Sequence, residues 1–405
     1  MASDNCGAYN IEDLRLLAKK KLPKGVFEYI DLGAEDYIAL QNNRDAYTDL
    51  KIKNRVLVDV SKRSTETKIF GNKLAMPYGI APTASAGLTI YGGEVHLAAA
   101  AARMGVVCTA ATNALTPMEE IYEAGGGGNL WFQLYMWSDK ELRLKFVEKV
   151  AAVGFETLIV TVDGPVGANR EHNLRNGYSM PLRYSPQLVA GILAKPGWCL
   201  RVLAQQYLKR GSFQKENYPP ELGRKLSDVD RATEAKQIKA DSQCWDDIKR
   251  IRDLWKGNLL IKGLQSAEDA VLAAELGLEG VVLSNHGGRY VDSSPSPLQV
   301  LPEVRAAVGE QFKVIIDSGP RRGSDIVKAM ALGADMVMSG RPTLYGCGAA
   351  GEAGAYRALE IFQTEMDRIM AQLGLNSVEE IGPQIFWNPP NWVPSAKAAL
   401  KAAAE

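Results

Sequence analysis

Eight short apolar runs, each followed by polar or small residues and then by a helical stretch, dominate the chain from residue 78 onwards. Successive runs begin 22 to 33 residues apart, except for 101 residues between the fourth and the fifth. Runs that are apolar throughout predict strands buried on both faces, and such strands are parallel. Eight β–α units favour a closed (β/α)8 TIM barrel over an open doubly wound α/β sheet. The predicted strands are YGIAPTA (78–84), VVCTAAT (106–112), LWFQLYM (130–136), TLIVTVDG (157–164), NLLIKG (258–263), GVVLSNH (280–286), KVIIDSG (313–319) and DMVMSGRP (335–342).

The segments outside these units are a helical start and one long insertion. Residues 10–22 have helical periodicity with acids early and lysines late, as the helix dipole prefers, and Pro23 ends the pattern. The gap after the fourth strand holds an insertion of about residues 181–245. We expect one barrel domain of residues 1–380 that includes the N-terminal helical segment and the insertion, followed by a C-terminal tail of residues 381–405.

The first half of the insertion has an unusual composition. Residues 181–215 contain six lysines and arginines and no acidic residue, mixed with many apolar residues. Insertions of this length in compact domains are usually functional. The segment is predicted to form a solvated lid over the barrel. The alternative is a peripheral contact with a membrane surface or a partner protein, which a basic and apolar composition also suits.

Charge and cysteine usage exclude several classes of protein. The formal net charge is zero, so no global field would attract nucleic acid. The five cysteines are scattered without a CxxC pair, which predicts reduced thiols, and no histidine, cysteine or carboxylate cluster has metal-ligand spacing. No apolar run reaches the roughly 18 residues of a membrane helix, and the start does not read as a signal peptide. A cytoplasmic location is expected, with association to the cytoplasmic face of a membrane as the alternative.

The predicted strands end in polar residues. In barrels of this architecture the functional side chains lie at the carboxyl ends of the strands, where a purely structural core would place valine and leucine. At least seven of the eight ends carry polar groups, and we expect these groups to converge on one mouth. They are Thr83, Gln133 with Tyr135, Thr161 with Asp163, Lys262, Ser284 with His286, Asp317 with Gly319, and Gly340 with Arg341.

The last two strand ends predict an anion site. IDSGPRRGSD (316–325) and MSGRP (338–342) each combine glycine with arginine. Glycines let backbone N–H groups approach an oxyanion, and the start of the following helix adds its positive end. The loops after strands seven and eight are the usual phosphate site of this architecture. The alternative is a pair of tight turns with solvated arginines.

His286 is the candidate base among only three histidines. It follows the sixth strand in LSNHGGRY (283–290), ahead of two glycines and three positions before Arg289. An imidazole with a pKa near neutrality suits proton transfer. His96 is predicted to be structural, within a helix, and His172 is expected on an exposed loop close to Arg170.

The motifs SNHGGR, IDSGPRRGSDIVKAMALGAD, GRPTLYG, WFQLY and TVDGP resemble those of the FMN-dependent 2-hydroxy acid oxidases and dehydrogenases. That family includes glycolate oxidase, lactate oxidase and mandelate dehydrogenase, and the stretch from Asp317 to Gly346 is most similar to mandelate dehydrogenase. The likeness runs from residue 22 to about residue 380, and only the insertion and the tail depart from it. It implies a (β/α)8 barrel that binds FMN, oxidises an (S)-2-hydroxy acid to the 2-oxo acid, passes electrons to O2 or a quinone, and assembles as a homotetramer.

The resemblance also implies roles for individual residues. His286 is the base, Asp163 orients it, and Arg170 and Arg289 clamp the substrate carboxylate. The substrate-side set is Tyr29, Tyr135, Asp163, Arg170, His286 and Arg289. The set that matches FMN contacts is Pro82, Thr83, Ala84, Gln133, Thr161, Lys262, Ser284, Asp317, Gly319, Arg321, Gly340 and Arg341.

The substrate is less closely constrained. Asn113 and Gly167 stand where glycolate oxidase tends to place bulky groups, which hints at a roomy pocket for mandelate or another large 2-hydroxy acid. Lactate and glycolate are the alternatives within the same chemistry. An FMN barrel that catalyses an isomerisation, or a non-catalytic flavin-binding barrel, are the alternatives outside it.

Overall fold

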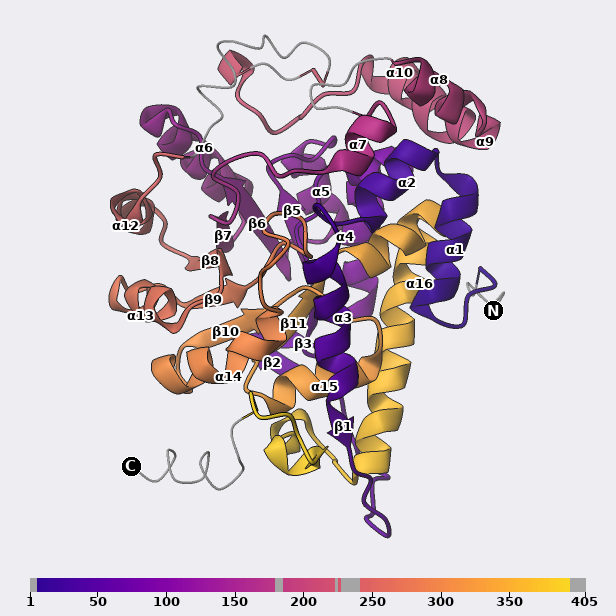
Figure 1. The fold of residues 1–405 in the computed structure, drawn as a ribbon. Coiled ribbons are helices and arrows are strands. Elements are labelled where there is room, and N and C mark those ends of the chain that lie inside the picture. The colour runs from indigo at the N-terminus through magenta and orange to yellow at the C-terminus, as the bar shows by residue number, and fades with distance from the viewer. Residues whose placement is uncertain (1–5, 179–184, 223–224, 227–240, 394–405) are drawn as a thin grey trace.

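The centre of the molecule is a closed barrel of parallel strands (Figure 1). The computed structural model describes residues 6–178, 185–222, 225–226 and 241–393. Around the barrel the strand order is β10-β11-β4-β5-β6-β7-β8-β9, so the first barrel strand, β4, pairs with the last, β11. All eight predicted strands are confirmed in this order, and all except β8 end before the last residue predicted for them. The barrel strands are β4 (Tyr78–Ile80), β5 (Val107–Ala111), β6 (Leu130–Tyr135), β7 (Thr157–Thr161), β8 (Asn258–Leu264), β9 (Gly280–Leu283), β10 (Lys313–Ile316) and β11 (Met336–Ser339).

Apolar side chains fill the inside of the barrel. A separate cluster of buried residues draws on strands β5 to β11 and on Ala81 after β4. The hairpin of β2 (Thr67–Ile69) and β3 (Asn72–Leu74) joins this cluster, and the ring of Phe70 at its turn lies 5.7 Å from that of Trp131. Because Trp131 is near the start of β6, the hairpin closes the amino-terminal end of the barrel. The carboxyl ends of the strands are left as the open mouth.

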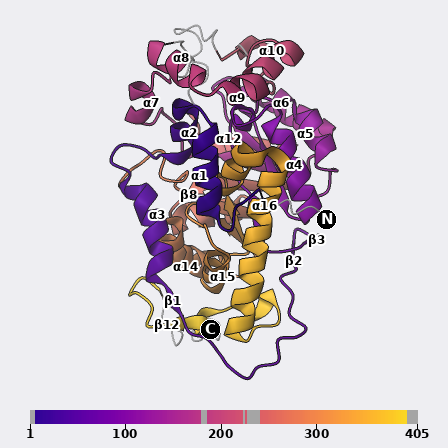
Figure 2. The ribbon, with the colours of Figure 1, turned by 90° about the vertical axis from the view of Figure 1, so that its right-hand side faces the viewer.

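Helices cover the outside of the barrel, and a larger apolar cluster fills the space between the two layers (Figures 1 and 2). The helical start that the sequence predicts is α1, which the side chain of Asn10 caps by accepting from the Asp13 N–H at 2.9 Å. The helices outside the insertion are α1 (Ile11–Lys21), α2 (Lys24–Asp31), α3 (Ile38–Asp49), α4 (Gly93–Met104), α5 (Met118–Ala124), α6 (Lys140–Val153), α7 (Glu171–Arg175), α12 (Trp245–Leu254), α13 (Ala267–Glu275), α14 (Pro297–Val308), α15 (Gly323–Ala331) and α16 (Arg341–Leu373), with the 3-10 turns η1 (Ala86–Leu88), η4 (Val378–Glu380) and η5 (Pro383–Ile385).

Much of the described part of the insertion is helical rather than loop. Figures 1 and 2 both show α8 to α10 gathered at one end of the molecule, above α7 and α2. Residues 181–184, 223–224 and 227–240 of the predicted insertion lie outside the described residues. The elements are α8 (Pro186–Leu193), α9 (Pro196–Trp198), the π-helical turn η2 (Cys199–Ala204), α10 (Gln205–Arg210) and η3 (Pro220–Leu222).

The predicted tail is partly built into the fold. Strand β12 (Phe386–Trp387) pairs antiparallel with β1 (Lys51–Ile52). Residues 394–405 of the tail lie outside the described residues.

In the part of the chain that the structure describes, no helix combines the length and apolarity that crossing a membrane needs.

Candidate active site

The mouth of the barrel holds a cavity of about 330 Å³. Every residue of the predicted substrate-side and FMN sets lines this cavity except Asp163 and Ser284. Those two lie behind its wall, where Asp163 is hydrogen-bonded to His286 and Ser284 to Lys262. The polar strand ends therefore meet in one mouth, while the role of each residue stays a prediction.

A tight turn after β9 brings the imidazole of LSNHGGRY into the cavity. His286, Gly287 and Gly288 have consecutive positive φ values of 57°, 69° and 71°. Histidine adopts this left-handed conformation more readily than most residues with a side chain. A Cβ atom at position 288 would lie 2.5 Å from the backbone nitrogen of Leu40, so only glycine fits there. The turn thus depends on the close approach of α3.

The His286 ring has a polar partner on each side. Its Nδ1 lies 2.9 Å from Oδ1 of Asp163, and its Nε2 lies 3.4 Å from the hydroxyl of Tyr135. An ionised Asp163 accepts the Nδ1 proton, which leaves the Nε2 lone pair directed at the cavity side. This imidazole can accept a proton from a bound molecule.

Burial and nearby charges set the protonation states of His286, Asp163 and Tyr135, and these states suit proton transfer to His286. Burial, opposed by the charge of Asp163, lowers the pKa of His286. Burial acts to raise the pKa of Asp163, but its interactions with His286, which include a hydrogen bond, and the charge of Lys262 outweigh burial, and the pKa is lowered. Burial raises the pKa of Tyr135 well above its ordinary value, so its hydroxyl remains a donor. A neutral base therefore stands between an orienting carboxylate and a phenol.

Four arginines line the cavity without a carboxylate partner. Within the described ranges, no salt bridge involves Arg170, Arg289, Arg321 or Arg341. Burial and the charge of Arg170 lower the pKa of Arg289 to about 9. Burial, with a contribution from Arg321, lowers the pKa of Arg341 to about 10. Both remain charged at neutral pH, and partly buried cations without counterions favour the binding of anions.

The carboxyl end of α2 holds two of these guanidiniums in place. Arg289 donates from Nη1 to the carbonyls of Tyr29 and Leu32 at 2.5 and 3.2 Å. Arg341 donates to the carbonyls of Ile30 and Leu32 at 2.9 and 3.1 Å. The last carbonyls of a helix have no helical partner and carry the negative end of its dipole. The N-terminal segment therefore builds part of the mouth.

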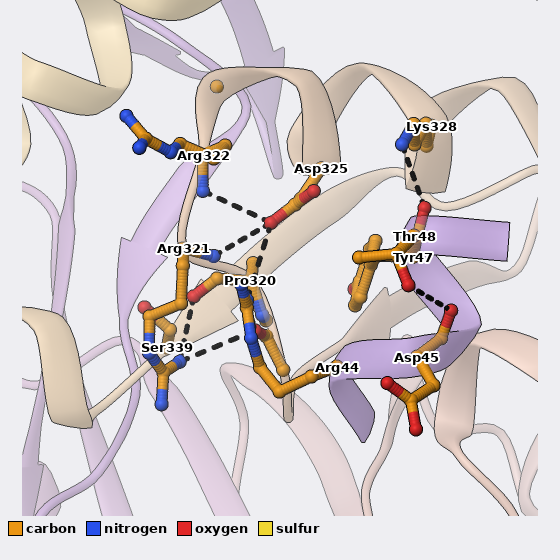
Figure 3. Close-up of polar contacts among 12 residues, drawn as sticks. Arg44, Asp45, Tyr47, Thr48, Pro320, Arg321, Arg322, Asp325, Lys328 and Ser339 are labelled. Carbon is orange, nitrogen blue, oxygen red and sulfur yellow. Dashed lines mark hydrogen bonds and ion pairs between the residues drawn. The ribbon is translucent and has the colours of Figure 1, made fainter. Parts of the chain in front are cut away.

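Beyond β10 the N-terminus of α15 is already capped from within the protein (Figure 3). Asp325 accepts the backbone N–H groups of Arg321 and Arg322 at 2.8 and 3.1 Å, and its carboxylate lies 3.6 Å from Nη1 of Arg44. The guanidinium of Arg321 donates to the carbonyl of Pro320 at 2.8 Å. These contacts fix the loop while Arg321 faces the cavity.

The N-terminus of α16, in contrast, is open to the cavity. Its N-cap is Gly340, and no side chain caps its first turn. A Cβ atom at position 340 would lie 2.7 Å from Cγ2 of Thr83, so the glycine keeps the approach to the helix clear. Unpaired N–H groups at a helix N-terminus, with Arg321 and Arg341 beside them, fit a phosphate group.

A buried lysine, Lys262, also lines the cavity. Lys262 is 3% exposed, and its ammonium lies 3.0 Å from Oδ2 of Asp317 and donates to Oγ of Ser284 at 2.7 Å. Burial acts to lower its pKa, but the charges of Asp317 and Asp163 outweigh this, and the pKa is raised. The ammonium is a permanent, fixed cation, and these two contacts leave its third N–H for another acceptor.

Three aromatic residues that have no predicted role also line the cavity: Trp137, Tyr218 and Tyr290. The rings of Trp137 and Tyr218 lie 5.5 Å apart, edge to face. Tyr218 belongs to the insertion, and its neighbour Asn217 is hydrogen-bonded to the backbone at the barrel mouth. Tyr290 directly follows Arg289, so its position was a usable signal, whereas nothing in the sequence distinguishes Tyr218 from other residues of the insertion.

His172 does not lie where the sequence suggested. It is in α7 rather than on an exposed loop, is 3% exposed, and has its ring 6.2 Å from that of Tyr37. Burial and the charges of Arg289 and Arg170 lower its pKa to about 4, so the ring is neutral. The error arose because a short polar helix that packs under the insertion cannot be told from a loop by local sequence.

Fold and site together define a flavin-nucleotide barrel of the oxidoreductase type. The open helix N-terminus with its arginines fits a nucleotide phosphate, and Lys262 is a fixed cation that lines the same cavity. The chain belongs to the family of FMN-dependent dehydrogenases, whose sequence model matches residues 18–388. FMN is therefore its cofactor, and the resemblance read from the motifs is confirmed. Among the described residues, no group of histidine, cysteine, aspartate or glutamate is arranged to hold a metal ion.

Individual relatives agree with this assignment. The chain is 38% identical over 380 residues to (S)-mandelate dehydrogenase of Pseudomonas putida, with 94% of each protein covered. It is 37% identical over 377 residues to a putative L-lactate dehydrogenase of Mycobacterium tuberculosis, covering 93% of this chain and 88% of that one. A crystal structure described as the monotopic membrane protein (S)-mandelate dehydrogenase has a TM-score of 0.87 and 37% identity, covering 94% of this chain and 99% of that one.

Proposed function

We propose that this FMN-dependent enzyme oxidises an (S)-2-hydroxy acid to the 2-oxo acid. One observation carries the proposal: two guanidiniums without carboxylate partners, Arg170 and Arg289, line the same cavity as His286, whose ring is hydrogen-bonded to Asp163 behind the wall. Guanidinium groups bind carboxylates through paired hydrogen bonds. A molecule with a carboxylate next to a hydroxyl-bearing carbon satisfies both halves of this site.

The substrate is held at both ends. Arg170 and Arg289 bind its carboxylate, with the Tyr29 hydroxyl as a further donor. Tyr135 keeps its proton because burial raises its pKa, and it donates to the hydroxyl oxygen as that oxygen becomes a carbonyl. Two fixed ends hold the reacting carbon in one place, which turns a chance encounter into a positioned reaction.

His286 removes a proton from the bound substrate. Conversion of CH–OH to C=O releases two electrons and two protons. FMN, when bound, would accept both electrons and one of the protons, and the protein takes the other proton. The Nε2 atom of His286 accepts a proton from the hydroxyl or from the α-carbon, and Asp163 stabilises the resulting imidazolium. Both routes require the same neutral imidazole.

The remaining polar groups of the cavity are assigned to the cofactor. Lys262 provides fixed positive charge where the cofactor gains electrons, and Arg321 and Arg341 bind its phosphate. The full set of proposed cofactor contacts is Pro82, Thr83, Ala84, Gln133, Thr161, Lys262, Ser284, Asp317, Gly319, Arg321, Gly340 and Arg341.

An aromatic or otherwise bulky substrate suits the walls of the cavity. Trp137 and Tyr218 line it, as does Asn113, whose Oδ1 is buried and has no hydrogen-bond partner in the described structure. Gly167, the other position taken to indicate room, does not line the cavity. Support for mandelate therefore comes from the aromatic wall, from Asn113 and from the mandelate dehydrogenases among the relatives.

Rates of anaerobic flavin reduction by (S)-mandelate, L-lactate and glycolate test the substrate class. Burial of a phenyl group against the aromatic wall contributes about 1.5–3 kcal/mol, so mandelate should have a kcat/KM at least about tenfold above the others. A preference for glycolate would refute the aromatic substrate but not the reaction. Flavin that no 2-hydroxy acid reduces would instead indicate the isomerase or the non-catalytic barrel.

We further propose that the helices of the insertion contact an anionic membrane surface and that a membrane quinone, rather than O2, takes the electrons. Leu193, Leu200 and Leu208 are 70%, 70% and 86% exposed on α8, η2 and α10. Lys195, Arg201 and Lys209 accompany them on the same segment, whereas Arg210 is paired with Glu120. Apolar side chains among basic residues are typical of a surface that lies on a bilayer.

The homotetramer is likewise proposed, from the family resemblance alone.

The membrane contact is tested by flotation with vesicles that contain anionic lipid. Leucine burial contributes about 1.5–3 kcal/mol per side chain, so serine at positions 193, 200 and 208 should weaken vesicle binding by at least about a hundredfold. The matched control replaces Val56 and Leu57, which are 72% and 103% exposed in the segment after β1, with serine. Equal vesicle binding by both variants would exclude the insertion as the contact.

A further inference from the structure

Tyr290 contacts both the proposed base and the proposed carboxylate clamp. Its ring centroid lies 4.8 Å from that of His286, with the ring planes at 80°. The guanidinium carbon of Arg170 lies 5.4 Å from the centroid of the same ring. The edge-to-face contact and the cation–π contact each favour one relative orientation of the two groups. One side chain therefore touches both groups that the reaction needs.

The protein makes room for this ring at a specific position. A Cβ atom on Gly164 would lie 2.5 Å from the Tyr290 hydroxyl and 2.6 Å from Cζ. The φ angle of Gly164 is not among the positive ones, so backbone conformation does not require a glycine there. Gly164 is needed because any larger residue would displace the Tyr290 ring.

His286 and Arg170 have few other restraints. The imidazole is hydrogen-bonded at 2.9 Å to Asp163, while its contact with Tyr135 is long, at 3.4 Å. The side chain of Arg170 makes one hydrogen bond to the described chain, from Nε to the carbonyl of Arg289 at 3.2 Å. One short hydrogen bond does not prevent either side chain from rotating about that bond. The Tyr290 ring contacts both groups and limits this rotation.

We propose that Tyr290 is a positioning residue that sets the orientation of Arg170 toward the substrate carboxylate and of His286 toward the substrate proton, an inference that rests on the proposed function. The aromatic ring does this, not the hydroxyl, because both contacts are made by the ring. Loss of the ring loosens the clamp and admits water beside the imidazole. The charged and titratable groups that face the imidazole are Asp163 after β7, Lys262 on β8, Arg170 at the start of α7, Tyr135 on β6 and Tyr290 itself.

The test compares Tyr290→Ala with Tyr290→Phe and uses phenylacetate, which has the carboxylate but no hydroxyl to oxidise. We expect Tyr290→Ala to raise the dissociation constant of phenylacetate and to slow anaerobic flavin reduction by (S)-mandelate, each about tenfold. The pH profile of the reduction rate should also change in Tyr290→Ala. Its acid limb should move to higher pH, because burial is the main cause of the low His286 pKa and access of water to the ring would raise that pKa. Tyr290→Phe should recover most of both losses. Gly164→Ala, which displaces the ring without altering Tyr290, should reproduce the alanine phenotype in part.

The outcomes separate this inference from the proposed function. Wild-type flavin that no 2-hydroxy acid reduces would overturn the proposed function and this inference with it. A wild-type enzyme that is active, alongside a Tyr290→Ala variant with unchanged phenylacetate binding, flavin reduction and acid limb, would overturn the inference alone. A phenylalanine variant as impaired as the alanine variant would also overturn it, because the hydroxyl would then be the acting group. Bound FMN per chain, measured in every variant, checks that the barrel has folded.

Discussion

Replacement of His286 by asparagine is expected to slow flavin reduction by (S)-mandelate by about 10²–10⁴-fold, the usual contribution of a positioned base. Asparagine is the sharpest substitution because residue 286 has a φ of 57°, and asparagine tolerates that conformation better than glutamine. The backbone N–H of residue 286, which donates to Oγ of Ser284 at 2.9 Å, is retained. The variant should therefore bind FMN normally. Rapid-mixing measurement of flavin absorbance without oxygen gives the rate directly.

His96→Asn is the matched control. His96 lies in α4, away from the cavity lining, so its replacement should leave the reduction rate within about twofold of wild type. Undiminished reduction in His286→Asn would show that another group takes the proton. Loss of FMN from that variant would instead mean that the turn after β9 had collapsed.

Replacement of Arg289 by methionine is expected to weaken the binding of phenylacetate and of 2-hydroxy acids by roughly 10- to 150-fold. This range corresponds to the loss of about 1.5–3 kcal/mol for hydrogen bonds to a charged group. The effect should appear mainly in the dissociation constant, which equilibrium titration of the flavin spectrum measures. Arg289→Lys should recover part of the loss, because lysine restores the charge but not the paired donors.

Arg341→Met provides the reciprocal comparison. Both guanidiniums donate to carbonyls at the end of α2, so both replacements disturb that helix end similarly. Arg341 is assigned to the cofactor phosphate, so its loss should weaken FMN retention, which Arg289→Met should leave largely intact. The clamp assignment would be contradicted if Arg289→Met bound phenylacetate as tightly as wild type.

The barrel could be predicted from the sequence because its signal is repeated and local. Buried parallel strands are apolar runs, and the polar residues that end them mark the mouth. Even there the strand ends were placed too late, since Thr83, Asp163 and Arg341 follow strands rather than continue them. The same reading could not find Tyr218, which reaches the cavity only because the insertion folds back and Asn217 ties it to the mouth.

Contacts between charged groups and distant parts of the chain could not be predicted from the sequence either. That Arg289 and Arg341 both rest on the carboxyl end of α2 depends on residues more than two hundred positions apart coming together. The burial of His172 likewise follows from packing that local composition does not reveal. Tyr290 is the instructive case: its neighbours His286 and Arg289 were singled out, yet only the three-dimensional contacts show that its ring touches the imidazole and the guanidinium of Arg170.

The visible absorption spectrum of the purified protein under argon, recorded before and after addition of (S)-mandelate, tests the central claim most directly. We predict one FMN per chain at the start and loss of the oxidised flavin bands once the acid is added. Protein without flavin, or flavin whose bands persist with mandelate, lactate and glycolate alike, would contradict the account.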